Sequence, residues 1–80
     1  MQAFSKRIDL YNKGEVVFNF QPIVSIEGHI YLITVDSNDQ FYIFKMKLFD
    51  NEWKIITPLN LPDWIIDMEI ELSELLNENY

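Results

Sequence analysis

The sequence contains no cysteine, and its 80 residues include only two glycines and three prolines. Without cysteine there is no disulfide framework and no thiolate nucleophile, which favours a cytoplasmic location over a secreted one. The first letters, MQAFSKRIDLY, contain no apolar run of the kind a signal peptide needs. No stretch approaches the ~18 apolar residues of a membrane span. We therefore expect a cytoplasmic protein with no membrane partner.

Motifs for catalysis, metal binding and phosphate binding are missing as well. His29 falls in an expected tight turn with no catalytic serine motif nearby, so a nucleophilic triad is not expected. DSNDQ (36–40) begins like a calcium loop, but Phe41 occupies the required glycine position and Lys47 the bidentate glutamate position. We expect no catalytic residue, no metal ligand and no cofactor, and we interpret the chain as a non-enzyme.

The charge is strongly negative and unevenly placed. The chain is 49% hydrophobic and 15% aromatic, and its net charge is −7. No lysine or arginine follows Pro62, whereas six acids do: Asp63, Asp67, Glu69, Glu71, Glu74 and Glu78. This block repels the phosphates of nucleic acids and membranes and attracts basic proteins. We therefore do not expect nucleic-acid binding, and we expect a protein partner with a basic surface.

The order of the segments predicts an α+β fold. Runs rich in β-branched and aromatic residues are separated by short turns within about 5–57, and a helical pattern follows at about 61–77. A chain of this length forms one domain, here 1–80. Short connections favour antiparallel neighbours. The expected fold is a curved antiparallel meander of four to five strands with one C-terminal helix packed on one face.

One face of the sheet is expected to form the core. Two-residue loops at 28–29, 37–38 and 50–51 give three hairpin registers that agree on the same face. Pro22 cannot donate to a ladder, so it must lie at a kink or an edge. The expected core face comprises Val24, Ile26, Tyr31, Ile33, Val35, Tyr42, Phe44, Met46, Leu48, Trp53 and Ile55.

The helix supplies the cover for that face. Asn60 is a plausible N-cap with Asp63 three residues later, and Leu59 with Trp64 resembles a hydrophobic staple. Glu74 and Glu78 lie near the negative end of the helix dipole, where a cation would be more favourable. The expected apolar stripe comprises Leu61, Trp64, Ile65, Met68, Leu72, Leu75 and Leu76.

The opposite face of the sheet is unusually apolar. Ile30, Leu32, Phe41 and Ile43 are expected to be neighbours there, although a water-facing sheet should alternate with polar residues. Either the N-terminal strand or a strongly coiled sheet covers these side chains, making a partial barrel, or Leu32, Phe41 and Ile43 form an exposed patch that binds another chain.

The outer side of the helix combines isoleucines with carboxylates. Ile66 and Ile70 lie one turn apart, opposite the core stripe, and are flanked by Asp67, Glu71 and Glu74. Such a surface is either simply solvated or an apolar centre with an acidic rim that suits a basic partner. We therefore predict a small protein–protein interaction module, such as an acidic inhibitor, an immunity-like protein or an adaptor. The alternatives are a self-assembling homodimer through the back of the sheet, or an enzyme or apolar-ligand carrier built on a partial barrel.

Overall fold

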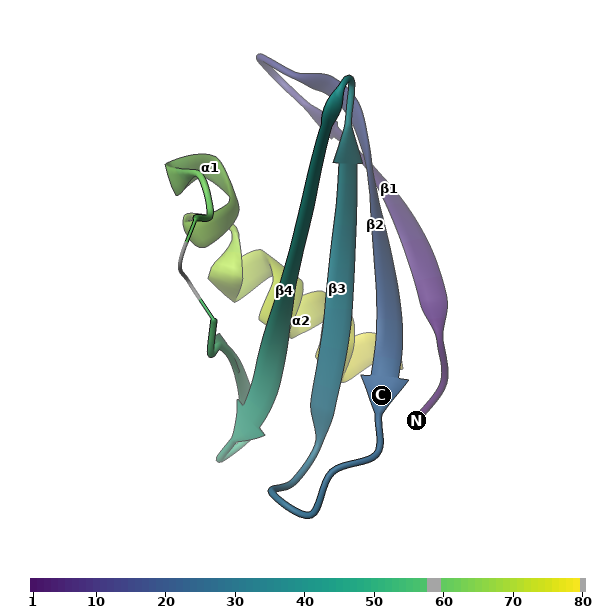
Figure 1. Cartoon of the computed structure of the whole chain (residues 1–80), viewed down its shortest axis with the longest axis vertical. Coiled ribbons are helices and arrows are strands. Elements are labelled where there is room, and N and C mark those ends of the chain that lie inside the picture. The colour runs from purple at the N-terminus through teal and green to yellow at the C-terminus, as the bar shows by residue number, and fades with distance from the viewer. Residues whose placement is uncertain (58–59, 80) are drawn as a thin grey trace.

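The computed structural model describes residues 1–57 and 60–79, which form one antiparallel sheet and two helical segments (Figure 1). The strands follow one another across the sheet in chain order, which confirms the predicted α+β meander. The elements are β1 (Phe4–Leu10), β2 (Gly14–Ile23), β3 (Ile30–Ser37), β4 (Gln40–Phe49), β5 (Glu52–Ile55), α1 (Asp63–Ile66) and α2 (Glu69–Asn79).

The sheet curls into a half-barrel, and α2 crosses its concave face (Figure 1). Tyr31 and Trp53 meet edge to face at the centre, with ring centroids 5.4 Å apart, and Phe4 stacks on Phe20 at 4.4 Å. Burial of each large apolar side chain contributes about 1.5–3 kcal/mol. The buried core comprises Val16, Phe18, Phe20, Tyr31, Ile33, Val35, Phe44, Met46, Trp53, Ile65, Met68, Leu72 and Leu76.

The β1–β2 hairpin depends on a glycine. The backbone N–H of Lys13 donates to the carbonyl of Leu10 at 3.1 Å, and Gly14 follows with φ of +71°. This is a three-residue hairpin loop followed by a residue in the left-handed region, which glycine adopts at little cost. The turn sets the register of the whole hairpin, from Leu10 opposite Gly14 to Phe4 opposite Phe20.

The β4–β5 hairpin has the predicted register, with Leu48 opposite Trp53. The β3–β4 hairpin turns one residue later than expected, so Val35 lies opposite Tyr42 rather than Gln40. This moves the pairing by two residues. Because side chains alternate with a period of two, every core residue of β3 and β4 stays on its predicted face.

Val24 and Ile26 were placed wrongly on the core face. Both are fully exposed, because β2 ends at Ile23 and residues 24–29 form a six-residue loop in place of the expected two-residue turn. In the observed register Phe20 lies opposite Ile33, the position predicted for Val24. The core positions of β2 are filled from further upstream, by Val16, Phe18 and Phe20.

Pro22 lies where β2 is an edge of the sheet, which is one of the two positions predicted for it. It pairs with Tyr31 of β3, but the pairing of β2 with β1 stops at Phe20. Its missing N–H therefore falls where β2 has no second neighbour.

The predicted single helix is divided in two. A tight turn at Asp67 and Met68 separates α1 from α2, with the N–H of Met68 donating to the carbonyl of Ile65 at 3.0 Å. Asn60 is not the N-cap: it has φ of +66°, and α1 is preceded by Pro62 without a side-chain cap. The expected staple involves Leu59, which lies outside the described residues. The apolar stripe is confirmed, since Ile65, Met68, Leu72 and Leu76 are buried and its other members, Leu61, Trp64 and Leu75, pack partly buried against the core.

Candidate interaction surfaces

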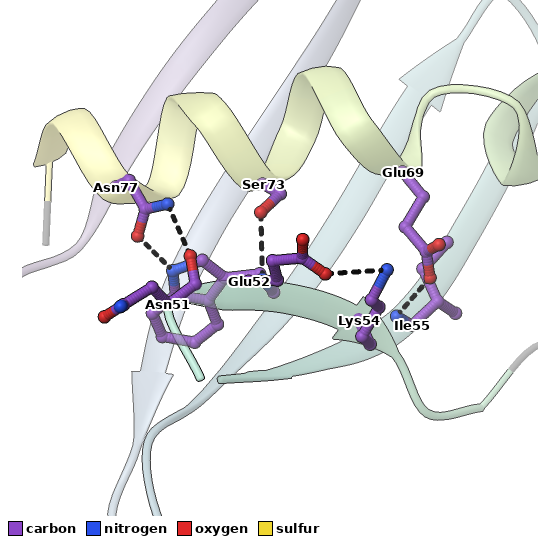
Figure 2. A network of polar contacts seen from close by, with 8 residues as sticks. Asn51, Glu52, Lys54, Ile55, Glu69, Ser73 and Asn77 are labelled. Atoms are coloured by element: carbon purple, nitrogen blue, oxygen red, sulfur yellow. Dashed lines mark hydrogen bonds and ion pairs between the residues drawn. The ribbon is translucent and has the colours of Figure 1, made fainter. Parts of the chain in front are cut away.

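Helix α2 lies along the outer edge of β5 and bonds to it through side chains (Figure 2). The backbone N–H of Trp53 donates to Ser73 Oγ at 2.9 Å, and that of Ile55 donates to Glu69 Oε2 at 2.8 Å. Two residues of a strand advance about 6.8 Å and four residues of a helix about 6 Å. Residues four apart on α2 therefore match residues two apart on β5, so side chains of α2 accept the outer N–H groups of Trp53 and Ile55, to which a sixth strand would otherwise pair.

Asn77 continues this row by another four residues. Its Oδ1 accepts from Trp53 Nε1 at 3.1 Å, and its Nδ2 donates to the carbonyl of Asn51 at 3.0 Å (Figure 2). The three residues Glu69, Ser73 and Asn77 are called the edge row below. Sequence reasoning missed the row: Glu69 was counted with the acidic block, and the available signal was the polar spacing of four beside the apolar stripe.

The outer side of α1 and α2 carries the predicted isoleucines and carboxylates. Ile66 is 40% exposed and Ile70 is 70% exposed, and the side chains of Asp67, Glu71 and Glu74 are exposed around them. These five residues are called the acidic helix face. Within residues 1–57 and 60–79 the ion pair present joins Lys54 to Glu52 at 3.2 Å, and none involves this face. Its carboxylates therefore carry uncompensated negative charge.

A groove of about 310 Å³ runs between the acidic helix face and β5. Ile70 and Glu74 line it from α2, and Glu52 and Lys54 line it from the strand. The lining also includes Trp53, Ser73 and Asn77, which are joined by the hydrogen bonds described above. Ile70 thus belongs to a surface that is concave and partly apolar.

The back face of the sheet, opposite α2, is not covered by any described element. β1 extends the sheet at its edge and does not fold over the back, so the N-terminal strand does not cover it as one reading expected. Phe41 is 60% exposed and Ile43 is 55% exposed, whereas Leu32 is half-buried. The back face is an exposed apolar surface centred on β4.

The observed register makes this apolar surface smaller than predicted. Leu32 lies opposite Lys45, Thr34 opposite Ile43, and Asp36 opposite Phe41. The prediction that Ile30, Leu32, Phe41 and Ile43 are neighbours was therefore wrong. The two-residue shift in register places a polar residue opposite each of Leu32, Phe41 and Ile43. The back-face residues and the acidic helix face lie on opposite sides of the sheet and do not form one site.

The β2–β3 loop forms a third apolar surface that the sequence did not indicate. Val24 and Ile26 are fully exposed, and the loop borders a groove of about 460 Å³ together with Met1 and His29. His29 Nδ1 lies 3.1 Å from Met1 Sδ. This surface was not predicted, because residues 24–26 were expected to continue the strand.

Among residues 1–57 and 60–79, no group of three or more His, Cys, Asp or Glu side chains could hold a metal ion. No helix formed by those residues is long and apolar enough to span a membrane.

The architecture defines a small α+β protein in which a curled meander is closed along one edge by its C-terminal helix. Comparisons of the chain with protein-family models, with curated proteins and with solved structures found no significant match.

Proposed function

We propose that this chain is a small, non-enzymatic protein–protein interaction module that binds a basic partner protein through the acidic helix face. The observation that carries the proposal is the exposure of Ile70, at 70%, among the carboxylates of Asp67, Glu71 and Glu74, which form no ion pair with any described residue. An apolar centre with a charged rim is the usual arrangement of an interface, where the centre supplies affinity and the rim steers association.

The placement of the carboxylates supports a role beyond folding. The last turn of α2 contains no basic residue, and Glu78 is exposed near its negative end. A carboxylate there opposes the helix dipole by about 0.3–1 kcal/mol. Glu69 differs, because its carboxylate accepts the N–H of Ile55 and so stabilises the edge of the sheet. The acids of the helix thus divide into one with a structural role and a group facing outward.

The mode of action follows from this chemistry. The module occupies a basic surface or groove on its partner, as an acidic inhibitor, an immunity-like protein or an adaptor does, and it needs no cofactor. Net charge of −7 disfavours nucleic acids and anionic membranes as ligands. The proposal assigns this activity to the cytoplasm, consistent with the lack of cysteine.

The test is an affinity capture from nuclease-treated lysate of the native host at low and at high salt, read by mass spectrometry. A stoichiometric basic protein released by salt is the expected result. Ile70→Asp and the double variant Glu71→Lys/Glu74→Lys should abolish capture, whereas Asp39→Lys, an exposed turn residue outside the helix, serves as the charge control. Capture unaffected by the helix variants would remove this face from the mechanism.

A second candidate function is self-assembly through the back face. Phe41 and Ile43 are more than half exposed on one strand, and Leu32 extends the apolar surface onto β3. Two chains would then bury these residues against each other as a homodimer. Under this alternative, Ile43→Lys should remove the back-face dimer and leave the chain folded; a native mass that is insensitive to this change would exclude the back face.

A further inference from the structure

The two edges of the sheet differ in whether another element of the chain bonds to their outer side. The outer N–H groups of Trp53 and Ile55 on β5 donate hydrogen bonds to the side chains of Ser73 and Glu69, respectively. β1 is the opposite edge, and no described element lies along its outer side (Figure 1). An open edge presents alternate unpaired N–H and C=O groups, which form a template for another strand. The chain therefore has one edge closed by its own helix and one edge available for pairing.

The charges on β1 are suited to pairing with a copy of itself. Ile8 and Leu10 pack against the core, so Arg7 and Asp9 point to the back face by alternation. Neither forms an ion pair among the described residues. Asp9 lies directly opposite Glu15 of β2, and like charges in that position destabilise a sheet. A cation on the open side of Asp9 would relieve this repulsion.

We propose that β1 pairs antiparallel with β1 of a second copy, centred on Ile8, so that the two sheets become continuous. In that register Arg7 of each copy lies opposite Asp9 of the other, and Ile8 lies opposite Ile8 on the side of the cores. Both carboxylate–guanidinium pairs form on the back face at once, because the two-fold axis repeats every contact.

The other symmetric registers are unfavourable. Antiparallel partners must point to the same face, so the two-fold axis passes between one residue of the strand and its own copy. Centring on Lys6, Arg7 or Asp9 places identical charges directly opposite each other. Centring on Phe4, Ser5 or Leu10 avoids this repulsion, but it pairs at most three residues of β1 and forms no Arg7–Asp9 pair. The charges and the length of β1 together therefore favour the register centred on Ile8.

The overall negative charge does not oppose this contact locally. Residues 1–23 contain three bases and two acids, whereas the acidic block begins after Pro62. This dimer does not depend on the proposed function, since it uses the free edge of β1 and leaves the acidic helix face and the back of β4 uncovered. A strand-edge contact is small, so the dimer should be weak.

Sedimentation equilibrium of the full chain tests the proposal. It is run between about 10 μM and about 1 mM, the concentration range in which small interfaces dissociate. The wild type should approach twice its monomer mass of 9.6 kDa. Arg7→Asp or Asp9→Arg alone should raise the dimer dissociation constant by about tenfold or more, since each turns two attractive pairs into two repulsive ones. The double variant Arg7→Asp/Asp9→Arg should restore the wild-type constant within about threefold, because it exchanges the partners and keeps the net charge.

The controls separate loss of pairing from loss of folding. Asp9→Arg removes the Asp9–Glu15 repulsion within the chain, so its circular dichroism and thermal midpoint should not fall. Ile43→Lys disrupts a back-face dimer and should leave the β1 dimer intact. A wild type that is monomeric at about 1 mM, single reversals without effect, or a double variant that stays dissociated would each overturn the proposal.

Discussion

Ser73 Oγ accepts a hydrogen bond from the backbone N–H of Trp53 at 2.9 Å, twenty residues away in the chain. This contact joins α2 to the edge of the sheet rather than to its face. The side chain of Trp53 is buried in the core, while its backbone N–H points outward to the helix. One residue thus fixes both the packing of the helix and the termination of the sheet.

Replacing Ser73 with alanine should lower the free energy of unfolding by about 1–2 kcal/mol, because the outer N–H of Trp53 loses its acceptor. Urea denaturation followed by tryptophan fluorescence measures this change. Ser73→Thr keeps a hydroxyl at the same position and is the matched control. Equal stability of the alanine and threonine variants would show that water satisfies this N–H equally well.

Glu69 should behave as a structural acid, unlike its neighbours. Glu69→Gln keeps an oxygen for the N–H of Ile55, while Glu69→Leu removes it and should cost about 1–3 kcal/mol more than the glutamine variant. Glu71→Gln and Glu71→Leu, on the exposed acidic helix face, should both stay within about 0.5 kcal/mol of wild type. Thermal or urea unfolding of the four variants checks the contrast, and a similar response at the two positions would contradict it.

Two positions two residues apart on α2 should differ sharply in their response to truncation. Leu72 is buried, so Leu72→Ala should cost about 2–5 kcal/mol through lost burial and a residual cavity. Ile70 is mostly exposed, and Ile70→Ala should change stability by less than about 0.5 kcal/mol. Chemical denaturation provides the measurement. A large loss for Ile70→Ala would mean that this side chain supports the fold rather than a partner.

Gly14 offers a test of backbone strain without steric crowding. Its φ is +71°, and an added Cβ would meet nothing within 4 Å. Gly14→Ala should therefore cost about 1 kcal/mol, owing to the left-handed conformation alone, and Gly14→Val should cost more. Gly14→Asn should be the mildest replacement, because asparagine tolerates this region. Thermal midpoints that do not follow the order Asn, Ala, Val would reject strain as the cause.

Glu78→Lys should stabilise the fold, in contrast to the usual effect of mutation. A cation near the last turn of α2 complements the helix dipole and should raise the free energy of unfolding by about 0.3–1 kcal/mol at low salt. High salt should reduce the gain. Because Glu78 belongs to the acidic block that follows Pro62, Glu78→Lys should also weaken binding to a basic partner. A variant that is neither more stable nor salt-sensitive would contradict the dipole argument.

The sequence by itself determined which side chains face the core. Tyr31, Ile33, Phe44 and Met46 occupy alternate positions of their strands, and the period of two keeps each on its face even when the register moves by two residues. The helical spacing of Ile65, Met68, Leu72 and Leu76 likewise defined one buried stripe. Local periodicity was sufficient for these features, because burial repeats with the geometry of the element.

The tertiary structure alone decided where elements end and which polar groups meet. VSI continues the alternation of β2, yet Val24 and Ile26 are exposed because the strand stops pairing at Ile23. The roles of Glu69 and Ser73 depend on N–H groups 14 and 20 residues away, which no local pattern encodes. The acidic helix face was visible in the sequence as Ile66 and Ile70 among carboxylates. The open edge of β1 was not, since an edge exists only once the order of strands is known.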